Sequence, residues 1–211
     1  MGDELFLERE THEFYHRLIP QLFENDRFGL KTFLRMDEPT FRHLTTLLKP
    51  TLQKFSPFRT PLSTEEKLAV TLRYLATGEI FKSLQYSFLI ASNTLSLVIP
   101  EVCDAIISVL GPIYMKTPTT AEEWHWIADA FESSWQFPNC LGAIYGKHIN
   151  IKKPAHSGTD YYNYKGFCSI VLLGVVDADY KFIRTEVGIN GRISDGGVWA
   201  RSDFKEAIED G

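Results

Sequence analysis

Apolar residues recur at helical spacing in the first part of the chain. Across residues 40–48 they fall three or four positions apart, which predicts an amphipathic helix. Asp37 or Thr40 is placed to cap this helix, and Pro39 suits its first turn. Pro50 then predicts the loop that follows.

A second helix is predicted between Ser63 and Gly78. Ser63 and Glu66 have the spacing of a capping box, and Gly78 is suited to end the helix in a left-handed conformation. The stripe that is expected to face the core consists of three leucines, Leu68, Leu72 and Leu75.

A short helix over residues 81–88 and a longer one over residues 92–110 complete the outline of a helix-turn-helix. Ser92 or Asn93 would cap the longer helix, and Pro100 predicts a kink or a helix start within it. Residues 62–110 carry a net charge of −2, and the longer helix begins with hydroxyl and amide side chains rather than Arg or Lys. Two interpretations stay open: a module that reads DNA, or a trihelical unit that only packs.

The pattern changes after residue 118, where a helix is predicted to begin at Thr119 or Thr120. Its apolar positions share one face and are Trp124, Ile127, Phe131 and Trp135. Three strand patterns follow, at residues 141–151, 169–176 and 181–189, and a tight turn at 177–180 pairs the last two as a hairpin. Asn190-Gly191 predicts a turn, and Ser194 or Asp195 caps a further helix. The fold class is therefore predicted to be α+β, with a helical module at 1–118 and a strand-rich segment at 119–211.

Composition narrows the class of protein. A chain of 211 residues with 44% apolar residues is long enough for one large core or two small ones. The longest uninterrupted apolar run, residues 170–176, is strand-sized, so no membrane partner is expected. Three widely spaced cysteines without a Cys-x-x-Cys pair are typical of buried free thiols in a reducing compartment.

Basic and aromatic residues alternate between residues 147 and 165. Asp160 is the only acid of this stretch, which has a net charge of +3, whereas the whole chain carries −5. Lysines neutralise phosphates, and aromatic rings stack on unpaired bases. The stretch is either a nucleic-acid-binding segment or a solvated loop between two strands. The candidate binding residues are Lys147, His148, Lys152, Lys153 and Lys165, interleaved with Tyr161, Tyr162 and Tyr164.

Residues 137–199 contain several short motifs that resemble one family. The motifs are Gly142-Ala143-Ile144-x-Gly146-Lys147-His148, Asn163-Tyr164-Lys165-Gly166, Val176-Asp177-Ala178-Asp179, and Asn190-Gly191-Arg192 running into Ser194-Asp195-Gly196-Gly197. Together they resemble the opening half of the catalytic domain of Harbinger-type transposases and the nucleases derived from them, the fourth group of the DDE superfamily endonucleases. The resemblance implies that residues 119–211 form the first part of an RNase H-like domain, three strands plus a helix, incomplete at its C-terminus. It also implies that the helical module ahead of it is helix-turn-helix-like.

The resemblance implies an activity as well. Members of the family are divalent-metal-dependent DNA endonucleases, in which carboxylates hold Mg²⁺ or Mn²⁺. The expected partners are DNA and a Myb-like protein. The expected location is the nucleus, with the cytoplasm as an alternative.

Tyr145 stands where the resemblance places the first catalytic aspartate. A phenol titrates at about pH 10 and offers one uncharged oxygen at neutral pH, so Tyr145 does not replace a metal-binding carboxylate. It is interpreted as a packed strand residue, which leaves no intact catalytic residue and weak or no binding of Mg²⁺ or Mn²⁺. Asp195 is the remaining candidate metal ligand, unless it caps the following helix. His148 either contacts a phosphate or is a structural histidine.

Three functional hypotheses follow. The first is a Harbinger-derived DDE nuclease family member that is catalytically inactive. The second is a domesticated DNA- or protein-binding nuclear factor. The third is a truncated gene product, because the family's later acidic motifs would lie beyond Gly211.

Overall fold

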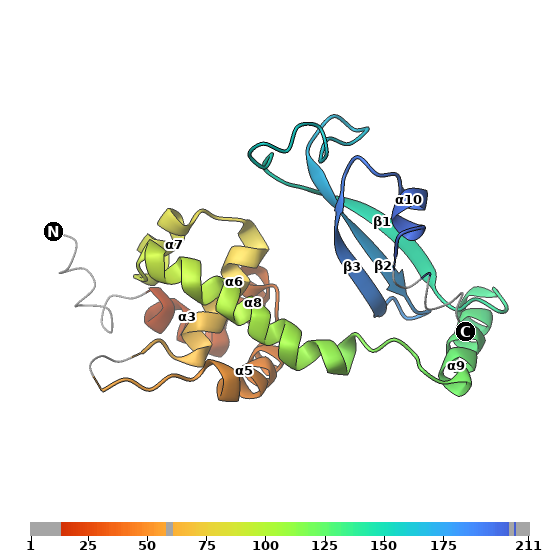
Figure 1. The fold of residues 1–211 in the computed structure, drawn as a ribbon. Coiled ribbons are helices and arrows are strands. Elements are labelled where there is room, and N and C mark those ends of the chain that lie inside the picture. Colours follow the sequence, from red (N-terminus) through yellow and green to blue (C-terminus); the bar gives the residue numbers. More distant parts are fainter. Residues whose placement is uncertain (1–13, 58–60, 203–204, 206–211) are drawn as a thin grey trace. The chain divides into compact units, whose positions relative to one another are not determined.

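The computed structural model describes residues 14–57, 61–202 and 205. The chain divides into two compact units, Met1–Gly111 and Pro112–Gly211. The first is helical, and the second contains a three-stranded antiparallel sheet with helices, so the fold is α+β as predicted (Figure 1). The boundary between the units falls in the last turns of a single helix, Ser92–Tyr114.

Helices form the described part of the first unit. They are α3 (Phe14–Asn25), α4 (Arg27–Leu34), α5 (Glu38–Leu52), α6 (Thr64–Thr77), α7 (Phe81–Phe88) and α8 (Ser92–Tyr114). Helix α6 packs against α4, α5 and α7. Their apolar faces enclose one core, in which Leu48, Leu68, Leu84 and Leu95 are fully buried.

Two of the predicted helix boundaries depend on side-chain caps that the structure confirms. The Asp37 carboxylate accepts a hydrogen bond from the Thr40 backbone N–H at 3.0 Å, so Asp37, not Thr40, caps α5. In α6, Ser63 and Glu66 form both hydrogen bonds of the capping box. Gly78 ends α6 with a left-handed φ of 67°, a conformation that glycine adopts without steric cost.

Other local predictions for the helical unit are wrong. Helix α5 continues through Pro50 to Leu52, because a proline in the last turn removes only one hydrogen bond while Leu52 is fully buried. Leu75 is 59% exposed, since the buried residues of α6 end at Thr71. The helix start expected at Pro100 is also wrong, because α8 is continuous across that residue.

The first turn of α8 differs from the predicted cap. Ser92 is already the first residue of the helix, and its hydroxyl donates a hydrogen bond to the side-chain oxygen of Gln85 at 2.6 Å. Its backbone N–H donates to the same oxygen at 3.3 Å. Ser92 therefore ties α8 to α7.

Helix α8 is long and apolar enough to cross a membrane by length and composition alone. It has 23 residues, and the mean hydropathy of its most apolar stretch is 1.7, with 28% of that stretch buried. Leu95, Val98 and Val102 of this helix lie in the core of the helical unit, as expected of a core helix. The longest uninterrupted apolar run in the sequence does not include α8, because Pro100, Glu101 and several polar residues interrupt its apolar positions.

The second unit begins with α9 and continues with the sheet. Its elements are α9 (Ala121–Trp135), β1 (Ala143–Asn150), β2 (Ser169–Val176), β3 (Phe182–Asn190) and α10 (Asp195–Trp199). The strand order is β1-β2-β3, and both pairs are antiparallel. The three strands lie within two residues of their predicted positions, and the order of three strands and a helix is the predicted one. The free cysteines Cys103, Cys140 and Cys168 are partly buried rather than fully buried.

Helices cover one face of the sheet. Val198 of α10 packs with Val171 and Leu173 of β2, while Ile127 and Phe131 of α9 pack with Val175. Directly opposed residues of paired strands share a face, so the other face carries Tyr145, Ile149, Val187 and their neighbours. Tyr145 is 70% exposed and Val187 61% exposed, so this second face is open within the described part of the chain. The interpretation of Tyr145 as a packed strand residue is therefore wrong, because no described element covers its face of the sheet.

The β2–β3 turn is built by one carboxylate. Asp177 accepts hydrogen bonds from the backbone N–H groups of Asp179 and Lys181, which confirms the turn predicted at residues 177–180. The indole N–H of Trp135 donates to the Ala178 carbonyl at 2.9 Å, and its ring packs edge-on against Tyr180. These contacts fix the end of α9 to the hairpin.

Candidate nucleic-acid interface

The segment between β1 and β2, residues 151–168, carries most of the predicted binding residues. Its two ends are paired, because the Ile151 N–H donates to the Cys168 carbonyl at 2.9 Å. Tyr162 and Cys168 form a further antiparallel bridge, and the Ser169 N–H donates to the Tyr161 carbonyl at 2.8 Å. The segment therefore folds as an ordered extension of the β1–β2 hairpin.

Asn163 organises the tip of this extension. Its side chain is buried, and Oδ1 accepts hydrogen bonds from the N–H groups of Lys165 at 2.9 Å and Phe167 at 3.3 Å. An asparagine that binds the backbone two residues ahead forms an Asx turn. Gly166 follows with φ of 87°, which favours glycine. The Asn163-Tyr164-Lys165-Gly166 motif is thus a turn that directs two side chains outward.

His148 is connected to Asn163 through a buried hydroxyl. Ser169 is fully buried, and its Oγ lies 2.8 Å from Asn163 Nδ2 and 2.9 Å from His148 Nδ1. His148 and Ser169 lie on the same face of the sheet, the one opposite Tyr145. His148 is therefore held at one ring nitrogen by the protein.

The ring of Tyr164 contacts both His148 and Lys165. Its ring centroid lies 5.6 Å from that of His148, with the two rings nearly perpendicular. Lys165 Nζ lies 5.4 Å from the same Tyr164 centroid, within the range of a cation–π interaction. Tyr164 is 82% exposed, so its ring also remains accessible to a ligand.

The other predicted lysines do not join this cluster. Lys147 lies on the open face of β1, opposite in direction to His148. Lys152 and Lys153 are exposed directly after β1. Within the described residues, neither these three nor Lys165 forms an ion pair with an acid. Their charges are therefore available to an anionic ligand.

The sequence did not predict the buried residues that position the side chains of the candidate interface. Asn163 and Ser169 are buried polar residues without an individual sequence signal, although Asn163 belongs to a recognised motif. Gly191 is the third, since a Cβ at that position would lie 2.6 Å from the Ser169 carbonyl oxygen and 2.9 Å from the Tyr161 carbonyl oxygen. Any side chain there would displace the Ser169 backbone. The turn predicted at Asn190-Gly191 was correct, but this close approach is a tertiary feature.

Comparison with known proteins shows what this chain resembles. Residues 144–211 match the family model of the DDE superfamily endonucleases. The chain is 26% identical over 179 residues to the Arabidopsis thaliana protein Antagonist of Like Heterochromatin Protein 1, covering 82% of this chain and 45% of the relative. An ALP1-like protein of the same plant is 28% identical over 191 residues, covering 86% of this chain and 46% of the relative. Residues 144–211 are thus similar to the DDE superfamily endonucleases, and most of the chain is similar to these plant proteins.

A third relative comes from an animal. HARBI1 of Xenopus laevis, whose name describes a candidate nuclease, is 22% identical over 180 residues, covering 85% of this chain and 52% of the relative. The chain thus spans about half the length of the curated relatives that it matches. No solved structure matches the chain significantly.

The resemblance implies carboxylates that hold divalent ions, so the surroundings of Tyr145 test whether such an ion fits here. Across the strands, Tyr145 is opposite Gly174, which is in turn opposite Thr185. Lys147, two residues along β1, adds a positive charge on the same face. The described side chains of this face include no carboxylate, so they do not fit Mg²⁺ or Mn²⁺.

Asp195 was the other predicted metal ligand. Its side chain lies outside the part of the chain that the structure describes. Its backbone position shows that it does not cap α10, because Ser194 is the cap and accepts a hydrogen bond from the Gly197 N–H. Asp195 is the first residue of the helix.

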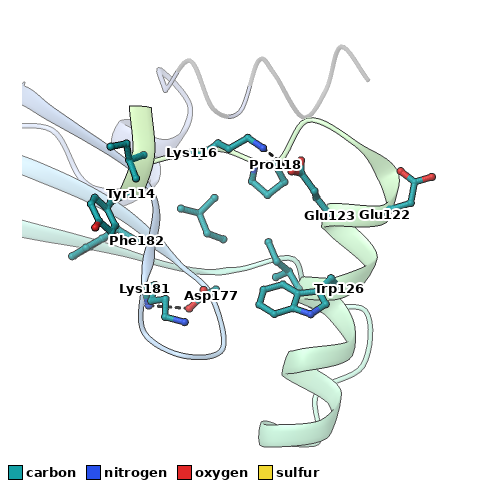
Figure 2. Close-up of a pocket in the computed structure, with 12 residues that line it drawn as sticks. Tyr114, Lys116, Pro118, Glu122, Glu123, Trp126, Asp177, Lys181 and Phe182 are labelled. Carbon is teal, nitrogen blue, oxygen red and sulfur yellow. Dashed lines mark hydrogen bonds and ion pairs between the residues drawn. The ribbon is translucent and has the colours of Figure 1, made fainter. Parts of the chain in front are cut away.

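A separate pocket lies between the last turn of α8, the start of α9 and the β2–β3 turn, all within the second unit (Figure 2). It has a volume of about 430 Å³. Its apolar walls include Tyr114, Trp126 and Phe182, and Trp126 is 62% exposed. An ion pair between Lys116 and Glu123 at 2.7 Å lies on its rim. The predicted nucleic-acid-binding residues are not among those that line it.

Proposed function

We propose that this protein is a DNA-binding member of the Harbinger-derived DDE endonucleases. We also propose that it does not cut DNA, because Tyr145 replaces a catalytic aspartate. The observation that carries the proposal is Tyr145 itself. It stands in the Gly142–His148 motif where the family resemblance places the first catalytic aspartate.

The chemistry around Tyr145 supports the absence of a metal centre there. A phenol remains protonated at neutral pH and supplies one neutral oxygen, whereas a bridging carboxylate supplies two charged ones. Lys147 on the same face raises the electrostatic cost of a bound cation. We therefore propose weak binding of Mg²⁺ or Mn²⁺, or none, in this chain.

The DNA-binding part of the proposal rests on residues 147–165. Lysines without acidic partners lie on an ordered extension beside an exposed tyrosine. Such groups bind the phosphate backbone and bases without requiring a catalytic centre. Location in the nucleus and cooperation with a Myb-like protein are part of the same proposal. The proposal does not include a DNA-binding role for the start of α8, because the Ser92 hydroxyl already donates a hydrogen bond to Gln85.

The test is a nicking assay on supercoiled plasmid with Mg²⁺ or Mn²⁺, using the 211-residue chain. We expect plasmid binding that weakens with salt and no nicking that a chelator abolishes. Tyr145→Phe keeps the ring but removes the oxygen, and it should behave like the wild type. Tyr145→Asp returns a carboxylate and should raise Mn²⁺ affinity. Chelator-sensitive nicking by the wild type that Tyr145→Phe abolishes would show that the phenol oxygen supports catalysis and would refute the proposal.

A protein-binding function is the second candidate, and the exposed Trp126 in the pocket of Figure 2 favours it. Tryptophan in an apolar depression with a charged rim is typical of interface anchors. A Myb-like protein is the partner that we propose for this surface. Trp126→Ala should weaken binding of the Myb-like protein at least fivefold. Ile107 on α8 is similarly exposed, and Ile107→Ala should leave this binding unchanged. Equal affinities for the wild type and Trp126→Ala would exclude this surface.

A further inference from the structure

We infer that His148, Tyr164 and Lys165 form a subsite for one unpaired nucleotide, in which His148 Nε2–H donates to a phosphate oxygen and Tyr164 stacks on the base. The inference rests on the proposed DNA-binding function and specifies the form of DNA that the β1–β2 extension takes. It assigns a defined role to three side chains that the structure places side by side.

The hydrogen bonds below the cluster favour one tautomer of His148, the one with its proton on Nε2. Asn163 Oδ1 accepts from two backbone N–H groups, so Asn163 Nδ2 is the donor to Ser169 Oγ. The Ser169 hydroxyl accepts that bond and has its own hydrogen for His148 Nδ1, 2.9 Å away. In this arrangement Nδ1 is the acceptor, and Nε2 carries the proton.

The Nε2 atom of His148 is available for a hydrogen bond to a ligand. No residue of the described part of the chain makes a hydrogen bond with it, whereas Nδ1 is held by a fully buried hydroxyl. Asn163 and Ser169 are themselves almost inaccessible, so they position His148 and do not touch a ligand. The arrangement presents a fixed donor on His148, and the Lys165 ammonium lies over the Tyr164 ring that His148 also contacts. Two donors, one of them charged, suit a phosphodiester oxygen pair.

The exposed Tyr164 ring favours single-stranded over double-stranded DNA. Tyr164 can stack only on a base whose face is uncovered, and in a duplex the neighbouring base pairs cover those faces. A single strand or an extruded base satisfies this condition. Another exposed tyrosine, Tyr86, also has a lysine over its ring, since Lys82 Nζ lies 5.3 Å from its centroid. That pair lies in α7, and no histidine ring packs against Tyr86 in the described structure. It is therefore a matched control.

The first test measures binding of a fluorescent single-stranded oligonucleotide and of its duplex to the full 211-residue chain. Tyr164→Ala should weaken single-strand binding on the order of tenfold and duplex binding much less, because one stacked base is lost. Tyr164→Phe keeps the ring and should retain wild-type affinity, as should Tyr86→Ala. If Tyr164→Ala binds the single strand like the wild type while Lys152→Ala with Lys153→Ala does not, DNA binding stands and the subsite is wrong. If the wild type binds neither oligonucleotide, the proposed function fails and the subsite with it.

The second test addresses His148 independently of DNA. Nitrogen-15 NMR of the free protein should show the Nε2–H tautomer of His148, and Ser169→Ala should weaken that preference and reduce single-strand affinity. His148→Gln places an amide nitrogen near the Nε2 position and should keep much of the affinity. His148→Asn reaches only as far as Nδ1 and should lose it on the order of tenfold. An Nδ1–H tautomer in the wild type, or equal loss in both His148 variants, would overturn the assigned role of His148 even if DNA binds.

Discussion

Thr45 and Thr71 are both buried threonines of the helical unit, but their hydroxyl groups differ in hydrogen bonding. Thr71 Oγ1 donates to the Lys67 carbonyl at 2.8 Å. Thr45 Oγ1 is buried and has no partner in the described part of the chain. A buried polar atom without a partner has lost its hydration and gained nothing in return. The two residues therefore contribute to stability with opposite signs.

Replacing these residues with valine, which has a similar shape, separates the two cases. Thr45→Val should raise the free energy of unfolding by about 1 kcal/mol, because it removes an unpaired hydroxyl from the core. Thr71→Val should lower it by about 1 kcal/mol, because a made hydrogen bond is lost. Urea denaturation followed by circular dichroism measures both. A destabilised Thr45→Val variant would mean that its hydroxyl has a partner after all.

Lys67 shows why some residue-scale features could not be predicted from the sequence. It is 3% exposed, and its Nζ donates to the Leu52 carbonyl at 2.8 Å and lies 3.4 Å from Glu101. Leu52 ends α5, and the last carbonyls of a helix lack intrahelical partners and attract cations. The sequence pattern places residue 67 in a helix but does not predict that its side chain is buried. Its burial depends on two helices that meet in space, and that information is not local.

Glu101 is the shared acid of this group. Burial raises its pKa, but hydrogen bonds and charges from Lys54 and Lys67 outweigh that effect and lower the pKa below its ordinary value. Lys54 Nζ lies 2.6 Å from Glu101. The ionised form of Glu101 is therefore the one that supports the buried Lys67 charge.

At the scale of elements, the start of α9 depends on Glu123. Its carboxylate accepts a hydrogen bond from Lys116 Nζ at 2.7 Å (Figure 2) and another from the backbone N–H of Thr119 at 2.8 Å. Thr120 completes the capping box by accepting from the Glu123 N–H. The hydrogen bond from Lys116, followed by that from Thr119, lowers the pKa of Glu123 from 4.5 to about 2.

This shift predicts how the stability of the second unit changes with pH. Because the folded pKa lies below the unfolded one, the contribution of Glu123 is fully present above pH 4.5 and disappears as pH falls towards about 2. The melting temperatures of the wild type and Glu123→Gln should thus differ at pH 7 and converge near pH 2. Tryptophan fluorescence measures this, since Trp124 and Trp126 lie in the same helix. Glu122→Gln is the matched control and should have no such pH-dependent effect. A constant difference across the pH range would contradict the assigned cap.

The elements that the sequence predicted best have local causes. The Ser63–Glu66 box, the Asp177 turn and the apolar run of β2 each depend on residues within a few positions of one another. The exposed end of α6 and the continuity of α8 depend instead on which neighbours cover them, so periodicity alone was misleading. The same contrast holds at the candidate interface. Its lysines and tyrosines were visible as a pattern, but the Asn163–Ser169–His148 connection joins residues up to 21 positions apart.

At the scale of the whole molecule, each unit has hydrophobic clusters of its own. The cluster of the helical unit draws on residues 19–110, whereas those of the second unit draw on residues 124–199. Domains with separate cores commonly unfold as separate cooperative transitions. The helical module predicted from the sequence at residues 1–118 can therefore be tested directly for independent unfolding.

The tryptophans make that measurement specific. All four lie in the second unit, at positions 124, 126, 135 and 199, so fluorescence reports only on that unit. Far-UV circular dichroism is dominated by the helices of the first unit. Leu48→Ala and Leu173→Ala remove the same groups from two buried sites, one in each unit, and each should cost about 2–5 kcal/mol. We expect Leu48→Ala to shift the urea midpoint seen by circular dichroism and leave the fluorescence midpoint unchanged. Leu173→Ala should do the reverse. If either substitution shifts both midpoints equally, the two units unfold as one, and residues 1–118 are not an independent module.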